Sequence, residues 1–545
     1  MCNYPHTDIM IKILKKAWLL SCTKKKNYPR LQSPASTATK DYNKFIDGVE
    51  IADRLWALYC VNRKSPISGT ESLGVIIGPY YRNISTIRTK KWVGSIVGLS
   101  LITIVSGYSA IHPILSAFLG ITAIKLATIR YCHIVSFFLM FGYLFFFRLA
   151  DRFGLPLSSG QTNLIEMIIV LRVVGVAFEI NGSWIAVGKA KKQDHEDKNE
   201  TDSKGVTDRD DEFLELINPS FTDLFHYSFN YVGLLTGPYY RYRTFDDYFH
   251  LPFSKYVDCT GFTINTLKIV PLYVSLYLAL SNVWPLEYVL SEDHNNRSFL
   301  YRMLYPWALF AAFRQRIYSG MTLAESVCTS AGLGAYPVQG RNRTGHGPTA
   351  GYLSLKKMSE EEAKVTQYDF NTVESMDVWG CETVVTLRDS MKVWNKAVQY
   401  WVAMVVYKRF PVKALKIHAA LFVSVIWHGF HAGYFFCIYF CPFYLMAEDI
   451  YYKLYYKDAT GMKKKIIGFI MWFLRSHSES YQAAAFLLLT FDRIWIYYSS
   501  VYHYWYGVWL AFLILGLILN HIHKLRRPKI FLNDNQNMRE TENKK

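Results

Sequence analysis

The sequence predicts an all-α integral membrane protein, a polytopic bundle of about 9–11 transmembrane or re-entrant helices. Hydrophobic residues make up 51% of the 545-residue chain, and aromatic residues make up 16%. The apolar residues gather in runs of bilayer-spanning length, and charged or Gly- and Pro-containing breaks separate those runs. Length alone would suggest several soluble domains, but the repeated apolar runs indicate one membrane bundle.

The charge of the chain fits a membrane setting. The formal net charge of +18 comes partly from tails and short loops in which Lys and Arg outnumber acidic residues. Such a pattern is typical of membrane topology and of contact with anionic lipid headgroups, and no nucleic-acid motif accompanies it. The nine cysteines lack the spacing of a zinc site or of a disulfide scaffold. We therefore expect a lipid bilayer as a partner, no nucleic acid and no metal site.

The chain divides into three predicted parts. Residues 1–75 read as a basic N-terminal tail, residues 76–523 as the membrane-embedded domain, and residues 524–545 as a polar C-terminal tail. Two polar loops interrupt the membrane domain, at 189–212 and at 341–374. The apolar segments expected to form helices are 92–108, 110–129, 133–149, 164–178, 266–280, 304–335, 433–452, 465–473, 482–498 and 504–522.

A helical hairpin at 387–434 is the most informative stretch. Two apolar segments flank a short basic connector that contains Pro411, and each segment carries a polar group of a kind that is rare in membrane helices. Asn395 lies 16 residues before Pro411, and His428 lies 17 residues after it. At ~1.5 Å per residue, both would lie roughly 25 Å from the turn. The spacing therefore predicts that an amide and an imidazole meet at one depth in a buried reaction centre.

The same stretch carries a family resemblance. The string WNKAVQYW at 394–401, followed by Trp427-His428-Gly429, resembles the signature of the membrane-bound O-acyltransferase family. GLLTGPYYRYRT at 233–244 and GAYP at 334–337 make the lysophosphatidylinositol acyltransferase branch of that family the most similar. The resemblance implies that residues 76–523 form an acyltransferase domain in the endoplasmic reticulum membrane. It implies transfer of a polyunsaturated acyl chain from acyl-CoA, a co-substrate, to lysophosphatidylinositol, with no permanently bound cofactor.

Acyl transfer from a thioester to a hydroxyl needs a base for the hydroxyl proton and donors for the developing oxyanion. His428 is the candidate base, and Asn395 is the candidate donor or orienting group. Gln399 lies one predicted turn after Asn395, and Trp394 precedes it; both are candidate substrate-binding residues. The structural alternatives are a packed histidine beside Trp427 and an amide that bonds two helices together.

Arginines outside the hairpin are further candidates. Arg241 and Arg243 would bind phosphate, either of coenzyme A or of the lysolipid headgroup, because guanidinium forks match phosphate oxygens. The alternative is an interfacial anchor made of arginines beside tyrosines. Arg314, Arg316 and Glu325 lie in an apolar run, where they would form a structural ion pair or line a substrate tunnel.

Other functions remain open at this point. An enzyme of the same family acting on another lysophospholipid or on a protein would carry similar motifs. The approach LRDSMKVWN at 387–395 differs from the Phe-Tyr-x-Asp-Trp-Trp-Asn element usual in sterol and diacylglycerol acyltransferases. A non-catalytic transporter or scaffold is the alternative from another class. Such a protein would more often show paired Gly or Pro breaks in symmetric halves, which this sequence lacks.

Overall fold

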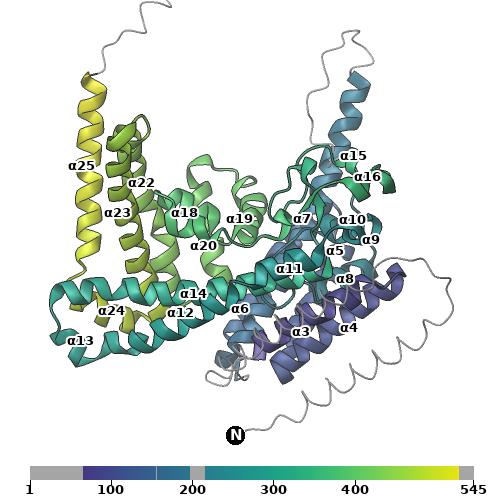
Figure 1. Cartoon of the computed structure of the whole chain (residues 1–545), viewed down its shortest axis with the longest axis horizontal. Helices are drawn as coiled ribbons and strands as arrows, with labels where there is room; N and C mark the ends of the chain where they lie inside the picture. The colour runs from purple at the N-terminus through teal and green to yellow at the C-terminus, as the bar shows by residue number, and fades with distance from the viewer. Residues whose placement is uncertain (1–65, 155, 157, 197–214, 527–545) are drawn as a thin grey trace, which may run out of the picture. The chain divides into compact units, whose positions relative to one another are not determined.

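The computed structural model of the chain describes residues 66–526, apart from 155, 157 and 197–214 (Figure 1). These residues belong to one structural unit and are mostly helical. Their one sheet consists of two short antiparallel strands, β1 (Tyr336–Pro337) and β2 (Tyr368–Asp369), with Tyr336 opposite Asp369. The predicted all-α class is therefore confirmed.

The helices fall into three groups along the chain. The first is α3 (Pro66–Arg82), α4 (Ile87–Ser106), α5 (Ile111–Leu126), α6 (Cys132–Arg148) and α7 (Gly160–Glu196). The second is α8 (Phe221–Phe229), α9 (Tyr242–His250), α10 (Phe253–Tyr256), α11 (Cys259–Leu267), α12 (Val270–Val283), α13 (Glu292–Asn296) and α14 (Phe299–Ala331). The third is α15 (Tyr352–Lys356), α16 (Glu360–Val365), α17 (Val378–Thr383), α18 (Leu387–Val393), α19 (Lys396–Val402), α20 (Lys416–His428), α21 (Ala432–Tyr434), α22 (Cys441–Tyr451), α23 (Gly461–Leu488), α24 (Phe491–Ser500) and α25 (Tyr504–Arg526).

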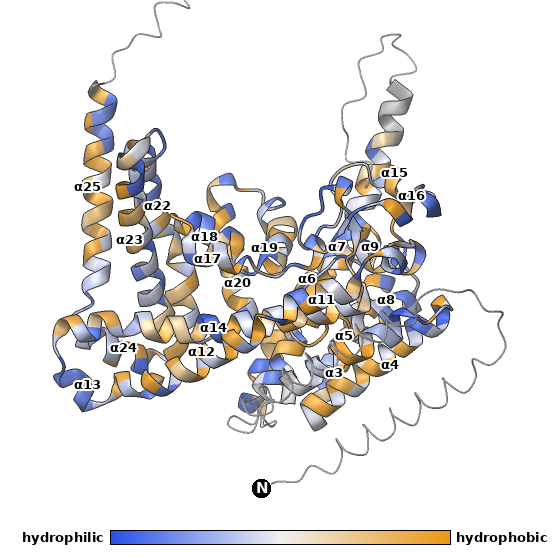
Figure 2. Ribbon diagram, viewed as in Figure 1, coloured by the Kyte–Doolittle hydropathy of each residue, from blue (hydrophilic) through white to orange (hydrophobic). Residues whose placement is uncertain are grey.

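Membrane character is concentrated in a few of these helices. Three helical stretches among the described residues are long and apolar enough to cross a bilayer, namely Ile87–Leu126, Cys259–Leu290 and Tyr504–Leu525. Helix α6 is apolar but shorter. Hydropathy colouring shows α4 and most of α25 as predominantly hydrophobic ribbons (Figure 2). The integral membrane class is confirmed, whereas the total of 9–11 helices remains a prediction.

Two predicted boundaries differ from the structure. Helix α3 begins at Pro66, so the boundary placed after residue 75 falls inside a helix, and residues 1–65 lie outside the described part of the chain. Helix α7 continues to Glu196, so the polar stretch expected as a loop from residue 189 begins as helix. Ala, Lys, Gln and Glu are good helix formers, which lets an apolar helix continue into a charged stretch.

Helix α14 packs against α3, α11, α12 and α23 (Figure 1). Its charged residues bond to other segments. The Arg314 side chain pairs with Glu382 of α17 at 2.9 Å, and Tyr318 donates to the same carboxylate at 2.8 Å. Glu325 accepts a hydrogen bond from the backbone N–H of Ser375. An Arg–Glu structural pair is therefore present, but its acid is Glu382 rather than Glu325.

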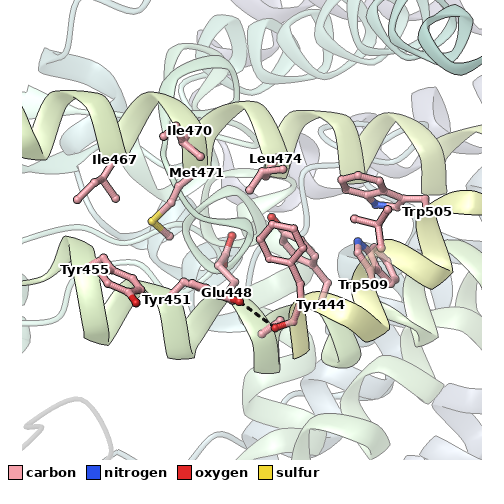
Figure 3. A pocket seen from close by; sticks show the side chains of 13 residues that line it. Tyr444, Glu448, Tyr451, Tyr455, Ile467, Ile470, Met471, Leu474, Trp505 and Trp509 are labelled. Carbon is pink, nitrogen blue, oxygen red and sulfur yellow. Dashed lines mark hydrogen bonds between the residues drawn. The ribbon is translucent and has the colours of Figure 1, made fainter. Parts of the chain in front are cut away.

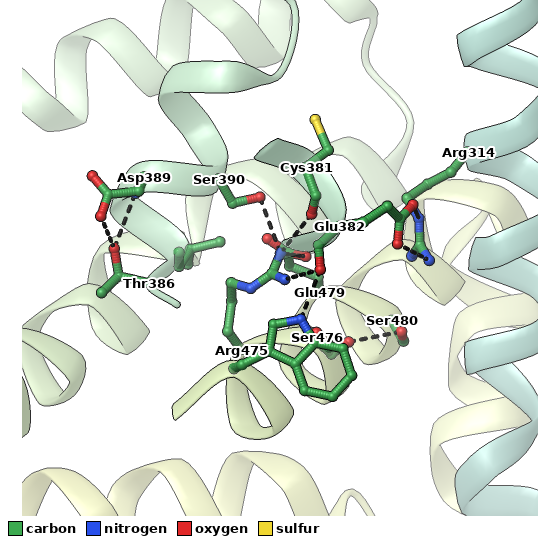
Figure 4. Close-up of polar contacts among 12 residues, drawn as sticks. Arg314, Cys381, Glu382, Thr386, Asp389, Ser390, Arg475, Ser476, Glu479 and Ser480 are labelled. Carbon is green, nitrogen blue, oxygen red and sulfur yellow. Dashed lines mark hydrogen bonds and ion pairs between the residues drawn. The ribbon is translucent and has the colours of Figure 1, made fainter. Parts of the chain in front are cut away.

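A buried arginine joins α23 to α17 and α18 (Figure 4). The guanidinium of Arg475 lies 2.8 Å from Glu479 and donates to the carbonyl oxygen of Cys381 at 3.1 Å. The indole of Trp472 donates to the carbonyl oxygen of Glu382 at 2.7 Å. These bonds hold the segment that leads into the central hairpin against α23.

The polar stretch 341–374, predicted as a loop, is folded and contains α15, α16 and β2. Its glycine-rich part returns on itself, with the N–H of Gly345 donating to the carbonyl oxygen of Thr372 at 2.9 Å. The amide of Asn342 donates to Asp369 at 3.0 Å, and both Asn342 and Thr372 are buried. The stretch is polar because its side chains bond to its own backbone and to one another.

Candidate active site

The predicted helical hairpin is present, but its first half is not one continuous helix. Helix α18 ends at Val393, and α19 begins at Lys396. Helix α19 continues into a π-helical turn at Ala403–Tyr407, and both pack against α20 across the connector. Asn395 immediately precedes α19, and His428 is the last residue of α20. The two candidate residues therefore lie at the same end of the hairpin.

Asn395 caps α19 instead of lying on its face. The backbone of Asn395 is left-handed, with φ 41° and ψ 58°, a region that asparagine tolerates better than most residues. Its side-chain oxygen accepts from the N–H of Val398 at 3.4 Å. The NH₂ group of this side chain makes no hydrogen bond with any described residue. One end of the amide is thus held by the helix, and the other remains available as a donor.

The residues next to Asn395 are fixed by the preceding segment. The N–H of Lys396 donates to the carbonyl oxygen of Ser375 at 2.7 Å, and the Lys396 ammonium pairs with Glu374 at 2.5 Å. Gln399 is exposed, and its amide donates to the carbonyl oxygen of Met391 at 2.9 Å. The Gln399 side chain is therefore bonded to α18, whereas the Asn395 side chain caps α19.

His428 ends α20 among aromatic rings. Its imidazole lies 5.6 Å from the ring of Phe486 and 5.8 Å from that of Tyr434, between centroids, and it makes no hydrogen bond with a described residue. Gly429 follows with φ 147°, and a Cβ at that position would meet the Tyr434 ring at 2.8 Å. Glycine therefore allows the chain to leave α20 directly after the histidine.

Helix α20 is anchored at this end by hydrogen bonds to α6 and α7. The guanidinium of Arg148 donates to the carbonyl oxygen of Ile426 at 2.5 Å and also to that of Trp427. Its Nε donates to Asn163 at 3.0 Å, and the Trp427 indole donates to the carbonyl oxygen of Met167 at 3.1 Å. The last carbonyls of a helix have no partner within the helix, so a cation bonded there stabilises its terminus. Arg148 thereby fixes the residues that carry His428.

A row of aromatic rings connects the two halves of the site. Phe486 of α23 contacts His428 and lies 5.6 Å from Phe313 of α14, which lies 6.5 Å from Phe310. Phe310 lies 6.4 Å from Trp394, the residue before Asn395. Trp394 also packs beside Tyr318 in an apolar cluster, so its ring contributes to this wall. The wall is apolar and would limit the access of water to a thioester.

The arginines of the 233–244 motif are buried and engaged with protein groups. Arg241 is 4% exposed, and its Nε donates to the carbonyl oxygen of His346 at 2.7 Å. Arg243 is 7% exposed, pairs with Glu215 at 3.5 Å and lies over the ring of Tyr352 at 5.0 Å. These contacts place Arg241 beside the glycine-rich stretch and Arg243 beside the start of α15. An exposed interfacial anchor does not describe either residue.

The glycine-rich stretch connects Arg241 to the hairpin. The imidazole of His346 meets the ring of Tyr400 in α19, with centroids 5.5 Å apart and planes at 86°. A Cβ on Gly345, which has φ 71°, would meet the same ring at 2.7 Å. Burial and the charge of Arg241 lower the pKa of His346 to about 2, so this imidazole stays neutral. Arg241, His346 and Tyr400 therefore form one packed unit that ends on α19.

Another buried arginine, Arg172 of α7, organises the segment before Arg241. Its guanidinium donates to the carbonyl oxygens of Tyr227 and Asn230 at 3.0 Å and of Val232 at 2.5 Å, and to the hydroxyl of Tyr240 at 3.0 Å. Sequence reasoning missed both Arg172 and Arg148. Each is a single arginine in an apolar helix, which is the signal that could have identified them.

Comparisons with known proteins bear on this site. The model of the MBOAT, membrane-bound O-acyltransferase family, matches residues 117–491, well over half of the chain and a range that includes Asn395 and His428. The chain belongs to this family. It is an O-acyltransferase.

Relatives match over most of their length. The chain is 43% identical over 452 residues to the membrane-bound acylglycerophosphatidylinositol O-acyltransferase frj of Drosophila melanogaster, covering 82% of this chain and 90% of that protein. It is 32% identical over 434 residues to the human protein of that description, MBOAT7, covering 79% and 89%. Its counterpart in Xenopus laevis is 31% identical over 455 residues, covering 83% and 93%.

Proposed function

We propose that this enzyme reacylates lysophosphatidylinositol, transferring an acyl chain from acyl-CoA to the free glycerol hydroxyl. The proposed acceptor is supported by the similarity to relatives that are named acylglycerophosphatidylinositol O-acyltransferases. The similarity covers about nine-tenths of the length of these relatives. A polyunsaturated chain as the donor and the endoplasmic reticulum as the location are parts of the same proposal. The proposed roles of His428 and Asn395 follow from their positions at one end of the hairpin.

The reaction proceeds by direct attack. The Nε2 or Nδ1 atom of His428 takes the proton of the lysolipid hydroxyl while that oxygen attacks the thioester carbonyl carbon. A C–O bond forms, and the NH₂ group of Asn395 donates to the carbonyl oxygen as it gains negative charge. The C–S bond then breaks, and the proton returns from His428 to the departing thiolate. Free coenzyme A and a diacyl phospholipid are the products, and no covalent enzyme intermediate is needed.

The single experiment that tests this function is a substrate panel. Purified protein in lipid nanodiscs is given saturated and polyunsaturated acyl-CoAs with lysolipids that differ only in headgroup, and the diacyl products are quantified. We expect the highest kcat/KM with lysophosphatidylinositol and a polyunsaturated donor. A clear preference for lysophosphatidylcholine or lysophosphatidylserine, or for a peptide acceptor, would replace the proposed acceptor and retain the enzyme class.

Arg241 and Arg243 are proposed to act on acyl-CoA phosphates. Because both guanidinium groups already bond to protein, a phosphate would have to share or replace these contacts. Arg243→Gln is the better test, since it leaves the contact between Arg241 and His346 in place. We expect a higher KM for acyl-CoA that depends less on salt, and an unchanged KM for the lysolipid. A rise in the lysolipid KM alone would assign the residue to the acceptor headgroup, and no change in either constant would leave it a structural role.

A further inference from the structure

A cavity of about 320 Å³ lies between α22, α23 and α25, away from the candidate reaction centre (Figure 3). This volume falls within the usual range of ligand pockets, ~300–1,000 Å³. Its lining is apolar and aromatic, with Tyr444, Met471, Leu474, Trp505 and Trp509 among the side chains that face it. The shape and the lining suit a hydrocarbon chain.

The one carboxylate in the lining, that of Glu448, already accepts a hydrogen bond from the protein backbone. Glu448 accepts from the backbone N–H of Leu387 at 2.8 Å, at the start of α18. The apolar lining offers water few hydrogen-bond partners, so water is a poor occupant. One wall, α25, is among the described helices that are long and apolar enough to cross a bilayer. A lipid acyl chain is the hydrocarbon that such a setting supplies.

A strongly basic segment follows the lining residues at one end of the cavity. Helices α22 and α25 run in the same direction, because Tyr444 contacts Trp509 and Tyr451 contacts Phe512, each pair with ring centroids 5.4 Å apart. Tyr455, also in the lining, follows Tyr451 toward the turn between α22 and α23. That turn carries five exposed lysines and one acid, Asp458; the lysines are Lys453, Lys457, Lys463, Lys464 and Lys465.

We propose that the cavity binds one acyl chain of an anionic phospholipid, whose phosphate lies against the lysines of the α22–α23 turn. The charge complementarity selects an anionic headgroup over a zwitterionic one. Leu474 in the lining precedes Phe486 by 12 residues on α23, and Phe486 contacts His428. At ~1.5 Å per residue these positions are about 18 Å apart, so the cavity is separate from the reaction centre, and we assign the bound lipid as a resident of the enzyme rather than as the reacting acceptor.

Photo-crosslinking tests the site. The full-length protein in nanodiscs is irradiated with phosphatidylglycerol or phosphatidylcholine that carries a diazirine in one acyl chain, and the labelled peptides are mapped by mass spectrometry. We expect labelling within 444–455, 467–474 and 505–512 that is strongest with phosphatidylglycerol. Equal labelling by both lipids, or labelling confined to other peptides, overturns the proposal.

Matched variants separate the two halves of the site. Replacing Lys463, Lys464 and Lys465 with Gln should lower labelling by phosphatidylglycerol about tenfold, since each lysine near a phosphate contributes to anionic lipid binding. The control exchanges the exposed Lys357 and Lys364 for Gln. Met471→Trp, which fills the cavity, should abolish labelling, whereas Ile514→Trp on an exposed part of α25 should not.

Two further outcomes are decisive. Unchanged labelling in the triple lysine variant, with the thermal stability of the protein retained, removes the headgroup contact and overturns the proposal. Competition by lysophosphatidylinositol at concentrations near its KM would make the cavity a route for the acceptor and would likewise overturn the resident-lipid assignment. Absence of such competition, with labelling intact in a His428→Ala protein, supports it.

Discussion

Asn395 caps a helix, and the proposed mechanism gives the same side chain a chemical role. Its oxygen caps α19, its backbone is left-handed, and its NH₂ group makes no hydrogen bond with a described residue. Glycine at this position would keep the backbone conformation, and exchanging an asparagine cap for glycine costs only a few tenths of a kcal/mol. The two roles are therefore separable by mutation.

We expect Asn395→Gly to lower kcat about 10²-fold, the scale for losing one oriented donor, with a nearly unchanged melting temperature. Asn395→Ala should lose both turnover and stability, because alanine is strained at positive φ. Turnover and melting temperature measured on the same nanodisc preparations check this. Normal turnover in the glycine variant would make Asn395 a structural cap alone.

His346 makes stability depend on pH. Burial and Arg241 hold its pKa at about 2, against ~6.5 for an unfolded histidine. A depressed folded pKa means that the contribution to stability is complete above pH ~6.5 and is lost as pH falls below that value, because the unfolded state then binds the proton. At pH ~5.5 the loss amounts to about 1 kcal/mol.

Melting temperatures at pH 7.5 and 5.5 therefore test the packing of the glycine-rich stretch. His346→Gln retains the carbonyl that accepts from Arg241 and should lose less stability on acidification than the wild type. His250→Gln, at an exposed position of α9, should respond like the wild type. An equal acid response in the wild type and His346→Gln would contradict the buried neutral imidazole.

At the scale of elements, the end of α20 is held by a side chain from another helix. Arg148 bonds the carbonyls of Ile426 and Trp427, directly before His428, and does not itself contact the imidazole through a hydrogen bond. Its role is to position the helix end. Losing it should therefore impair the chemical step more than substrate binding.

Arg148→Met should lower kcat about tenfold or more with little change in either KM, and Arg148→Lys should restore part of the rate because one donor remains. Arg152→Met, at an exposed position on the following turn, is the matched control and should behave like the wild type. Steady-state kinetics with both substrates measure kcat and the two KM values for these variants. A rise in KM with normal kcat would move Arg148 from positioning to substrate binding.

The elements themselves were partly predictable. Apolar periodicity predicted the hairpin and most helices of the first group, because burial of an apolar face is a local pattern. It predicted one helix through Asn395 and Gln399, whereas the left-handed backbone of Asn395 makes Lys396 the first residue of α19. The folding of 341–374 and the anchor at Arg148 depend on contacts between distant segments, which periodicity does not contain.

At the scale of the whole molecule, the family and the enzyme class were predictable from short motifs alone. The match to residues 117–491 confirms both. The motifs identify the chemistry because few residue types can perform it. For Arg241 and Arg243 the sequence left two roles open, phosphate binding and an interfacial anchor, because it does not show whether the side chains are buried. The structure buries both guanidinium groups against protein partners.

Elements from several parts of the chain contact one another or the hairpin near its open end. Helices α6 and α7 anchor the end of α20, α14 and α23 supply the aromatic wall, and the glycine-rich stretch packs against α19. All of these elements converge on the end of the hairpin that holds His428 and Asn395. In the proposed mechanism, His428 at this end is the base of the acyl transfer.

The role of His428 as the base is tested by the release of free thiol from acyl-CoA in the presence of lysophosphatidylinositol. His428→Ala should lower the rate by about 10³-fold or more, within the range for losing a general base, while the protein stays folded and binds acyl-CoA. His431→Ala, three residues away on an exposed position, should keep most of the rate. Normal thiol release without His428, or an equal loss from both substitutions, would show that His428 is not the base.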